Sequence, residues 1–226
     1  SVTDTSAKGT IDYYVQPALP LQEEMTQTRE AVVVLADSTW HAMLARKQLR
    51  IEWQPGKVNY SHSGEVRDTL EALAQTPGTV VRQTGNSFAA DESTISASYY
   101  TPMQYQAQME PMECTAIVNK GKCEIWAPVQ WPHFAQKSVA SYLGFELDEV
   151  IINPIRMGGS FGRKYCDDFV IECVAIARKH AGTHIQSQWT REDDITGGGP
   201  QIACAHLLSA QLDAEQRVSH WLHRFC

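Results

Sequence analysis

The chain lacks several features that mark common functional classes. Its 26 acidic side chains outnumber its 19 lysines and arginines, so its formal net charge is −7 and no basic stripe is present for a nucleic acid. No apolar run approaches the roughly 20 residues that a membrane-spanning helix needs. Residues 1–9 are polar and carry no signal-peptide pattern. We therefore predict a folded protein without a nucleic-acid partner.

The six cysteines are not spaced like metal ligands. None of them forms the C-x-x-C pair that zinc and iron–sulfur sites use. Cys166 and Cys173 lie two helical turns apart in the sequence, in step with apolar neighbours. The helical rise would separate them by roughly 10 Å, which is too far for a mutual disulfide. We expect them to be buried thiols that act as small hydrophobic side chains.

Composition and pattern predict an α+β fold. The 226 residues are 43% hydrophobic and 20% charged, which is ordinary for a globular domain. Strand-like and helix-like segments follow one another in mixed order, which favours mixed sheets with packed helices over a doubly wound sheet. Helices are predicted to begin at 37–38, to cover 66–74 and 132–143, and to begin near Cys166 and end at Gly182. Strands are predicted at 31–36, 49–53, 79–83, 94–100, 114–118, 123–126, 150–155, 185–189, 203–212 and 218–225.

Two features of organisation follow from these elements. The segments between 31 and 53 would form a β-α-β unit that ends at a turn over 54–56. The polar stretch 87–93 is the best candidate for a domain boundary, and it divides the chain into 1–90 and 91–226.

The most informative segment is 157–164, with the sequence MGGSFGRK, which lies between the predicted strand 150–155 and the helix that begins near Cys166. Its three glycines allow backbone conformations that a Cβ would forbid, and they permit close approach to a ligand. The N-terminus of the next helix offers N–H groups to an anion. This combination is typical of a loop around a polyanionic cofactor, although many glycine turns between a strand and a helix bind nothing.

Three further motifs accompany the glycine segment: MEPMECTA at 109–116, EIWAPVQWP at 124–132 and WTREDD at 189–194. In this order the set resembles the molybdopterin-binding large subunit of the molybdenum hydroxylases, the xanthine dehydrogenase and aldehyde oxidase superfamily. It is most similar to the isoquinoline 1-oxidoreductase β-subunit branch. The resemblance covers about 31–226. It implies a partial hammerhead-like α+β subdomain over 1–90 and the first part of a molybdopterin-binding domain over 91–226.

The resemblance assigns roles to particular residues. Gln130 matches a glutamine that forms hydrogen bonds near the molybdenum, and an uncharged amide suits that role because it both donates and accepts. Phe161 and Gly162 match a pair whose backbone approaches an oxo ligand of the metal. Gly158, Gly159 and Ser160 would form the preceding turn. Ser160 replaces the glycine that is commonest in the family, a change expected to matter little.

Two positions differ from the xanthine-oxidising branch. Arg163 replaces a further glycine, and it is equally suited to face a phosphate or substrate or to pair with Asp167. Tyr165 replaces a substrate-binding glutamate. That replacement argues against purine oxidation and favours an N-heteroaromatic or aldehyde substrate, with Tyr165 either a substrate contact or ordinary helix packing.

Other polar groups are weaker candidates for a site. Glu110 and Glu113 are more typical of turn residues than of a catalytic carboxylate pair. The carboxylates of 192–194 are more typical of a solvated turn that pairs with Arg191 or caps the next segment than of a metal cluster. The pairs His180/His184 and His220/His223 would each point to different faces, so neither predicts a metal site.

The resemblance also implies the cofactor and the partners. The cofactor would be a molybdenum pyranopterin, either as molybdopterin or as its cytosine dinucleotide. Electrons would pass to a small subunit with [2Fe–2S] clusters and, in the periplasmic branch, to a c-type cytochrome. The family's catalytic base is a glutamate near the C-terminus of the full subunit, and no matching motif occurs here. We therefore expect an inactive fragment, located in the periplasm or cell envelope.

Two alternatives compete with this hypothesis. A scaffold or interaction module would retain the fold without catalysis. A nucleotide-binding domain would use the glycine loop differently, but the sequence lacks the G-x-G-x-x-G spacing and the acidic residue that should follow it.

Overall fold

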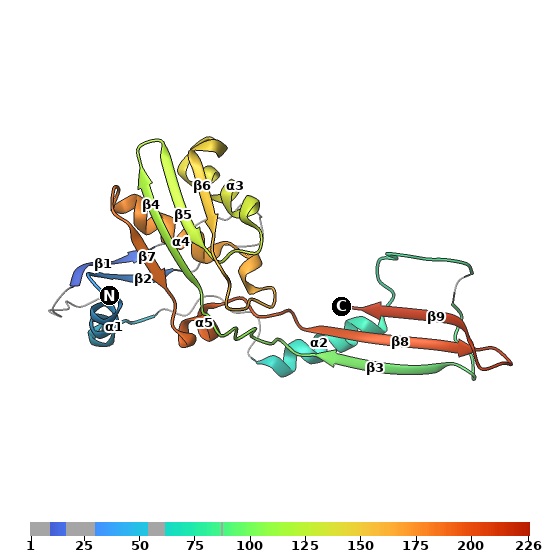
Figure 1. Ribbon diagram of the computed structural model, residues 1–226. Helices are drawn as coiled ribbons and strands as arrows, with labels where there is room; N and C mark the ends of the chain where they lie inside the picture. Colours follow the sequence, from blue (N-terminus) through green and yellow to red (C-terminus); the bar gives the residue numbers. More distant parts are fainter. Residues whose placement is uncertain (1–9, 17–29, 54–61, 87) are drawn as a thin grey trace. The chain divides into compact units, whose positions relative to one another are not determined.

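The computed structural model describes residues 10–16, 30–53, 62–86 and 88–226 (Figure 1). The chain forms two compact units, each built from two separate stretches of sequence. The first unit contains 1–54 and 106–199, and the second contains 55–105 and 200–226. These units do not follow the predicted division at 90/91, because strands distant in the sequence pair with one another. The family identities of the two predicted domains remain predictions.

The first unit is built on a four-stranded sheet in the order β6-β5-β4-β7 (Figure 1). Its strands are β4 (Glu113–Asn119), β5 (Lys122–Ala127), β6 (Val150–Pro154) and β7 (Ile185–Gln188). β5 and β6 run parallel, whereas β4 is antiparallel to both β5 and β7. A tight turn at Gly121, with a φ of 71°, joins β4 to β5 as a hairpin.

Two helices cover one face of this sheet. α3 (Pro132–Leu143) begins with a proline in its first turn and ends at Gly144, which has a φ of 70°. α4 (Asp168–Lys179) packs against β4, β7 and α3. Alternate residues of β4 and β5 are buried, as the period of a half-covered strand requires.

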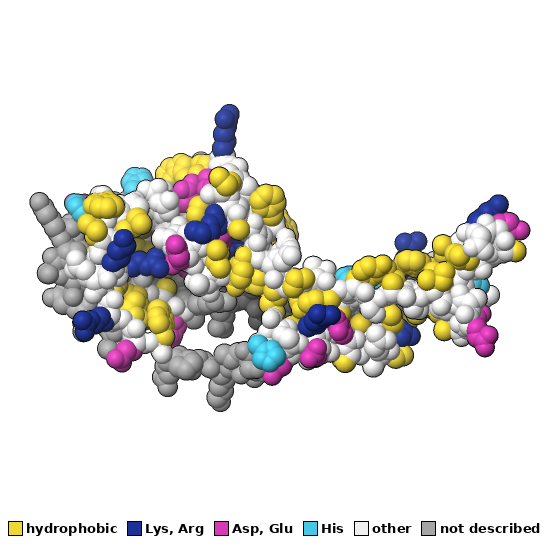
Figure 2. All heavy atoms as spheres, turned by 90° about the horizontal axis from the view of Figure 1, so that it is seen from below, with side chains coloured by type: hydrophobic (Ala, Val, Ile, Leu, Met, Phe, Trp, Pro, Cys, Tyr) yellow, Lys and Arg dark blue, Asp and Glu magenta, His cyan; other side chains and the backbone are white. Residues whose placement is uncertain are grey.

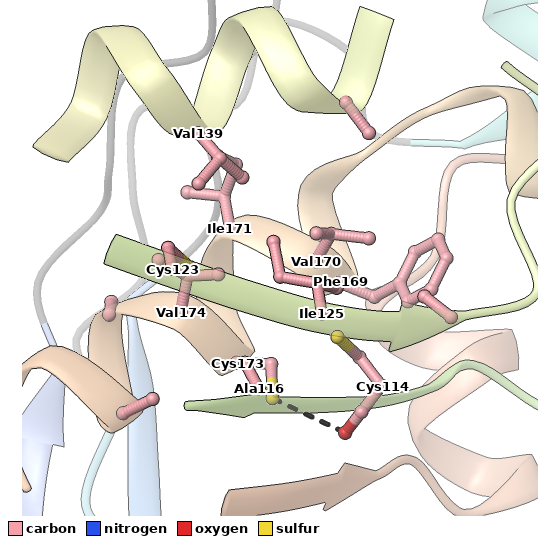
Figure 3. Close-up of a cluster of buried hydrophobic side chains, with 14 of the residues drawn as sticks. Cys114, Ala116, Cys123, Ile125, Val139, Phe169, Val170, Ile171, Cys173 and Val174 are labelled. Carbon is pink, nitrogen blue, oxygen red and sulfur yellow. Dashed lines mark hydrogen bonds between the residues drawn. The ribbon is translucent and has the colours of Figure 1, made fainter. Parts of the chain in front are cut away.

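The core of the first unit lies between this sheet and the two helices (Figure 3). It contains three of the cysteines, and the Cys173 thiol donates a hydrogen bond to the Cys114 carbonyl at 3.2 Å. Cys123 is also fully buried, and burial raises the pKa of its thiol to about 12. The prediction of buried thiols is therefore correct for Cys173. It is wrong for Cys166, which is exposed because α4 begins two residues after it.

Among the remaining elements of the first unit, one predicted strand is absent. β1 (Thr10–Gln16) and β2 (Ala31–Ala36) form an antiparallel pair, and α1 (Thr39–Gln48) begins after the N-cap Ser38. Over 49–53 only Ile51 takes part in an isolated bridge and no strand forms, so the predicted β-α-β unit is wrong. β2 pairs instead with β1, which precedes it. The turn predicted at 54–56 lies outside the described residues. The short helices are η1 (Leu147–Glu149), η2 (Arg163–Tyr165) and α5 (Arg191–Gly197).

The second unit is a three-stranded antiparallel sheet in the order β3-β8-β9 (Figure 1). Its strands are β3 (Ile95–Thr101), β8 (Cys204–Leu212) and β9 (Val218–Phe225). The amphipathic helix α2 (Ser63–Gln75) packs against β8 and β9. No strand forms over the predicted segment 79–83, where Val81 is 82% exposed. The mixed sheet of the first unit, the antiparallel sheet of the second and the helices packed on them confirm the α+β class. Among the described residues, no helix is long and apolar enough to cross a membrane.

Candidate functional site

The glycine segment forms a loop between β6 and α4 whose shape depends on its glycines. Gly159 and Gly162 have φ values of 94° and 93°, in the left-handed region where a Cβ causes strain. A Cβ on Gly158 would lie 2.6 Å from the Cβ of Glu110. Two hydrogen bonds join Gly158 of the loop to Glu110. The Glu110 N–H donates to the Gly158 carbonyl, and the Gly158 N–H donates to Glu110 Oε2. The glycines therefore allow the loop to pack against the segment that precedes β4.

Lys164 links the loop to the interior of the first unit. Its side chain has no exposed surface and forms an ion pair with the Glu110 carboxylate. Burial acts to raise the pKa of Glu110, but the Lys164 ammonium and the Gly158 N–H outweigh burial and lower it. Glu110 does lie in a bend, as predicted, yet it also binds both ends of the glycine segment. Local sequence patterns do not indicate this role, because the two partners of Glu110 lie 48 and 54 positions away.

Gln130 lies beside the loop, as the resemblance implies. Its N–H donates to the Lys164 carbonyl at 3.0 Å, and its Oε1 accepts from the Ser160 hydroxyl at 2.7 Å. Ser160 Oγ in turn accepts from the Lys164 N–H at 2.7 Å. The structure thus brings Gln130 together with the loop residues Ser160 and Lys164.

Arg163 points away from solvent. It is 2% exposed, and its two terminal nitrogens donate to the Asp168 carboxylate at 2.8 and 2.7 Å. Its guanidinium also lies over the Trp189 ring, 5.4 Å from the centroid. The predicted pairing with Asp167 is therefore wrong, because the 3₁₀ turn η2 directs the side chain to the first residue of α4. Contact of Arg163 with a phosphate remains a prediction.

Trp189 connects this ion pair to a half-buried carboxylate. Its indole N–H donates to Glu172 Oε2 at 3.1 Å. Burial, with a smaller contribution from the Asp168 charge, raises the pKa of Glu172 to about 7. No sequence pattern indicates this group, since Glu172 occupies an ordinary position within an amphipathic helix.

Four aromatic side chains lie on or next to the loop. Phe161 is 68% exposed and has a φ of 53°. Trp131 stacks on Phe134 with ring centroids 5.1 Å apart, and it lies 5.2 Å from the Tyr165 ring. Trp131 and Tyr165 remain partly exposed. Tyr165 thus packs against other aromatic rings, and its contact with a substrate remains a prediction.

The WTREDD segment is a capped helix, not a solvated turn. Thr190 and Asp193 exchange hydrogen bonds at the N-terminus of α5, and Asp194 pairs with Arg191 at 2.5 Å. These contacts confirm the predicted capping and pairing. However, Asp194 is only 2% exposed, because the buried side chain of Gln108 also donates to it. Among the described residues, no group of three His, Cys, Asp or Glu side chains is arranged to hold a metal ion.

A pair of histidines that the sequence analysis did not predict lies in the second unit. His206 Nδ1 and His223 Nε2 are 2.9 Å apart on β8 and β9. His220 lies in another register position of β9, opposite Gln211, so the expected separation of His220 from His223 is correct. The adjacent-strand contact could not be derived from spacing along one strand.

Two pockets of the described residues are not lined by the loop. One, of about 300 Å³, is lined by α2, β3 and β8 of the second unit. A smaller one of about 80 Å³ lies at Glu113, Trp126 and Ile155. Neither includes Gln130 or any residue of 157–165.

Sequence similarity relates this chain to a known domain family and to curated proteins. The family model of the molybdopterin cofactor-binding domain matches residues 72–221. A membrane-bound aldehyde dehydrogenase [pyrroloquinoline-quinone] of Gluconacetobacter polyoxogenes is 25% identical, over 97% of this chain and 29% of its own length. The isoquinoline 1-oxidoreductase β-subunit of Brevundimonas diminuta is 28% identical, over 83% of this chain and 26% of its own.

Solved structures show the same fold. The quinoline 2-oxidoreductase of Pseudomonas putida 86 aligns with all of this chain and 33% of its own, with a TM-score of 0.69 at 16% identity. At that identity the likeness shows the fold alone. The chain spans less than a third of the two curated relatives. Because the family model covers more than half of its residues, the chain belongs to the family of molybdopterin cofactor-binding domains.

Proposed function

We propose that this chain supplies one wall of the molybdopterin site in the large subunit of a molybdenum hydroxylase that oxidises an N-heteroaromatic compound or an aldehyde. The observation that carries the proposal is the position of Gln130. Its side chain is exposed, and its Oε1 is held by Ser160 of the glycine loop. The name of one relative refers to pyrroloquinoline quinone, so relatives' names do not decide the cofactor. The family match and the loop favour molybdopterin.

The residues present fit such a group. Within the described part of the chain, the N–H groups of Gly159 and Gly162 make no hydrogen bond, and a Cβ at either glycine would strain the backbone. A loop that combines bare N–H groups with close backbone approach suits an anionic, oxygen-rich ligand. The neighbouring Gln130 amide offers uncharged donors beside it. Gln130, Gly158, Gly159, Ser160, Phe161 and Gly162 would hold the group.

When bound, the molybdenum centre supplies the oxidation of a substrate carbon with oxygen from water. The residues of this chain have simpler tasks. Gln130 orients an oxygen ligand by hydrogen bonding, and the glycine loop brings its backbone close to the group. The exposed Phe161 ring excludes water from that side. Tyr165 and Trp131 present partly exposed rings, which favours a flat, weakly polar substrate.

Further parts of the proposal concern the complete protein. The proton-accepting glutamate belongs to another part of the subunit. A small subunit with [2Fe–2S] clusters takes the electrons, with a c-type cytochrome as a further acceptor. The pterin is a candidate for the cytosine dinucleotide form, and the location is the periplasm or cell envelope. These statements rest on the resemblance to the isoquinoline 1-oxidoreductase branch.

The test is the molybdenum and pterin content of three proteins purified from a host that makes the cofactor. They are the 226-residue chain, the complete gene product and the complete product with Gly159→Val. We expect near-stoichiometric metal in the complete product, little in the chain, and little in the variant because valine is strained at this φ. A complete product that is folded but free of metal and pterin would instead support a scaffold that retained only the fold.

A further inference from the structure

Ser160 occupies a position where the resemblance leads us to expect glycine, and the structure shows that its hydroxyl is used. The residue is 5% exposed. Its Oγ accepts the Lys164 N–H at 2.7 Å and donates to Gln130 Oε1 at 2.7 Å. The three residues form a relay from a backbone donor, through one hydroxyl, to a side-chain carbonyl. A glycine at position 160 would leave both partners without these bonds.

The relay determines which end of the Gln130 amide faces outward. A serine hydroxyl carries one hydrogen. Because the Lys164 N–H already donates to Oγ, the serine hydrogen is free to point at Gln130, and there it meets Oε1. Since this bond occupies Oε1, Nε2 is the polar atom of the amide that remains available. Within the described residues Nε2 makes no hydrogen bond, and Gln130 is exposed.

The other end of the relay is fixed in the protein interior. The Lys164 side chain is fully buried and paired with Glu110, which also binds the Gly158 N–H. The Lys164 carbonyl accepts the Gln130 N–H at 3.0 Å, so the backbone of Gln130 is held by the same residue that orients Ser160. Gln130 is therefore fixed at its backbone and at its carbonyl oxygen, with only its NH₂ group free.

We propose that Ser160 is a positioning residue that presents Gln130 to a ligand as a hydrogen-bond donor. The ligand group that fits is an oxygen acceptor, such as an oxo group or another anionic oxygen. The identity of that ligand rests on the proposed function, whereas the orientation of the amide does not. The expectation that serine in place of glycine changes little is replaced by a specific role.

The experiment measures side-chain amides of the ¹⁵N-labelled 226-residue chain by NMR, without cofactor. Gln136 is the matched control, because its Nε2 donates to the carbonyls of Leu147 at 3.0 Å and Val150 at 2.8 Å. Both amides are assigned from their alanine variants. Two quantities are compared: the order parameter of each Nε2, and the hydrogen-exchange rate of its protons.

In the wild-type chain, we expect both side-chain amides to be ordered, with order parameters of about 0.8. Only the amide protons of Gln136 should be protected from exchange. In Ser160→Ala, the Gln130 order parameter should fall below about 0.6 while Gln136 is unchanged. Ser160→Thr retains a hydroxyl and should restore the order. A merely structural role of Ser160 would not distinguish Gln130 from Gln136 in this way.

Two results would overturn the proposal. One is a Gln130 amide that stays equally ordered in Ser160→Ala. The other is protection of the wild-type Gln130 protons from exchange, because bonded protons mean that Nε2, and not Oε1, faces Ser160. The second result needs no variant, so the proposal stays testable if Ser160→Ala does not fold. These measurements test the relay of hydrogen bonds. The metal content of the complete gene product tests the proposed function separately.

Discussion

The two units of the chain differ in the charged side chains that they bury. The buried charged residues among the described ones are Arg163, Lys164, Asp167 and Asp194, and all belong to the first unit. The second unit buries only uncharged polar groups, such as Ser209 and Gln211, and it leaves large apolar side chains in solvent. Figure 2 shows hydrophobic side chains exposed along its strands.

This difference distinguishes the surroundings of the glycine loop from the rest of the chain. Exposed apolar residues are common on protein surfaces, whereas buried charges are rare unless they are paired. Two of the buried charges of the first unit, Arg163 and Lys164, belong to the glycine segment. Lys164 pairs with Glu110 and Arg163 pairs with Asp168, and these two ion pairs hold the loop against the protein interior. The burial of charge, more than the count of apolar residues, marks the candidate site.

The largest expected effect comes from replacing an apolar side chain of the first unit. Phe169 is 1% exposed in the core, whereas Phe225 in the second unit is 60% exposed. We expect Phe169→Ala to reduce the free energy of unfolding by about 3–5 kcal/mol, because it removes buried contacts and leaves a cavity. Phe225→Ala should change it by less than about 0.5 kcal/mol. Denaturant unfolding measures both, and equal losses would contradict the contrast between the units.

The two members of the buried ion pair should not be equivalent. Lys164 has no exposed surface, but the Glu110 side chain is 25% exposed. Glu110→Gln leaves an ammonium without a counter-charge and without access to water, a loss of about 3 kcal/mol. Lys164→Met leaves a carboxylate that reaches solvent, so its cost should be smaller. Unfolding curves of both variants check this order, and the reverse order would mean that Lys164 escapes to water in the absence of Glu110.

A pH dependence should distinguish Glu172 from surface carboxylates. Its pKa is raised from an ordinary value of 4.5 to about 7, chiefly by burial, with the Asp168 and Asp193 charges in the same direction and Arg163 in the opposite one. Between these pH values the folded state holds a proton that the unfolded state has lost, so stability falls as the pH rises. The loss is about 3 kcal/mol for this shift.

Glu172→Gln should remove this part of the pH dependence and stabilise the protein above pH 7. The measurement is the unfolding free energy at several pH values from 5 to 8. Glu215→Gln, an exposed residue between β8 and β9, is the control for the chemical change itself. A variant with the same slope as the wild type would show that Glu172 does not control it.

Local signals predicted more of the fold than of the site. Gly144 ends α3 and Ser38 caps α1 where the sequence indicated, because these effects act within a few residues. The missing strand at 49–53 depended on the choice of partner for β2, which propensity does not specify. The resemblance placed Gln130 beside the loop, but its contact with Ser160 spans 30 positions and that of Lys164 with Glu110 spans 54. Such contacts arise only when β4, β5 and the loop have packed.

The smallest predicted effect concerns two glycines with equally open surroundings. A Cβ would meet no atom within 4 Å at Gly162 in the first unit or at Gly78 in the second, but only Gly162 has a positive φ, 93°. Gly162→Ala should therefore lose about 1 kcal/mol through backbone strain alone. Gly78→Ala should be neutral or slightly stabilising, since alanine restricts the unfolded chain.

Because neither substitution creates a clash, their difference in unfolding free energy isolates the backbone conformation of the loop. Equal values for the two variants would show that position 162 relaxes out of the left-handed region at no cost. In that case the loop would not be held in a fixed shape by the packing behind it. A loss confined to Gly162 would instead show that the network of the first unit holds position 162 in the left-handed region, so that the loop keeps the shape that allows close approach to a ligand.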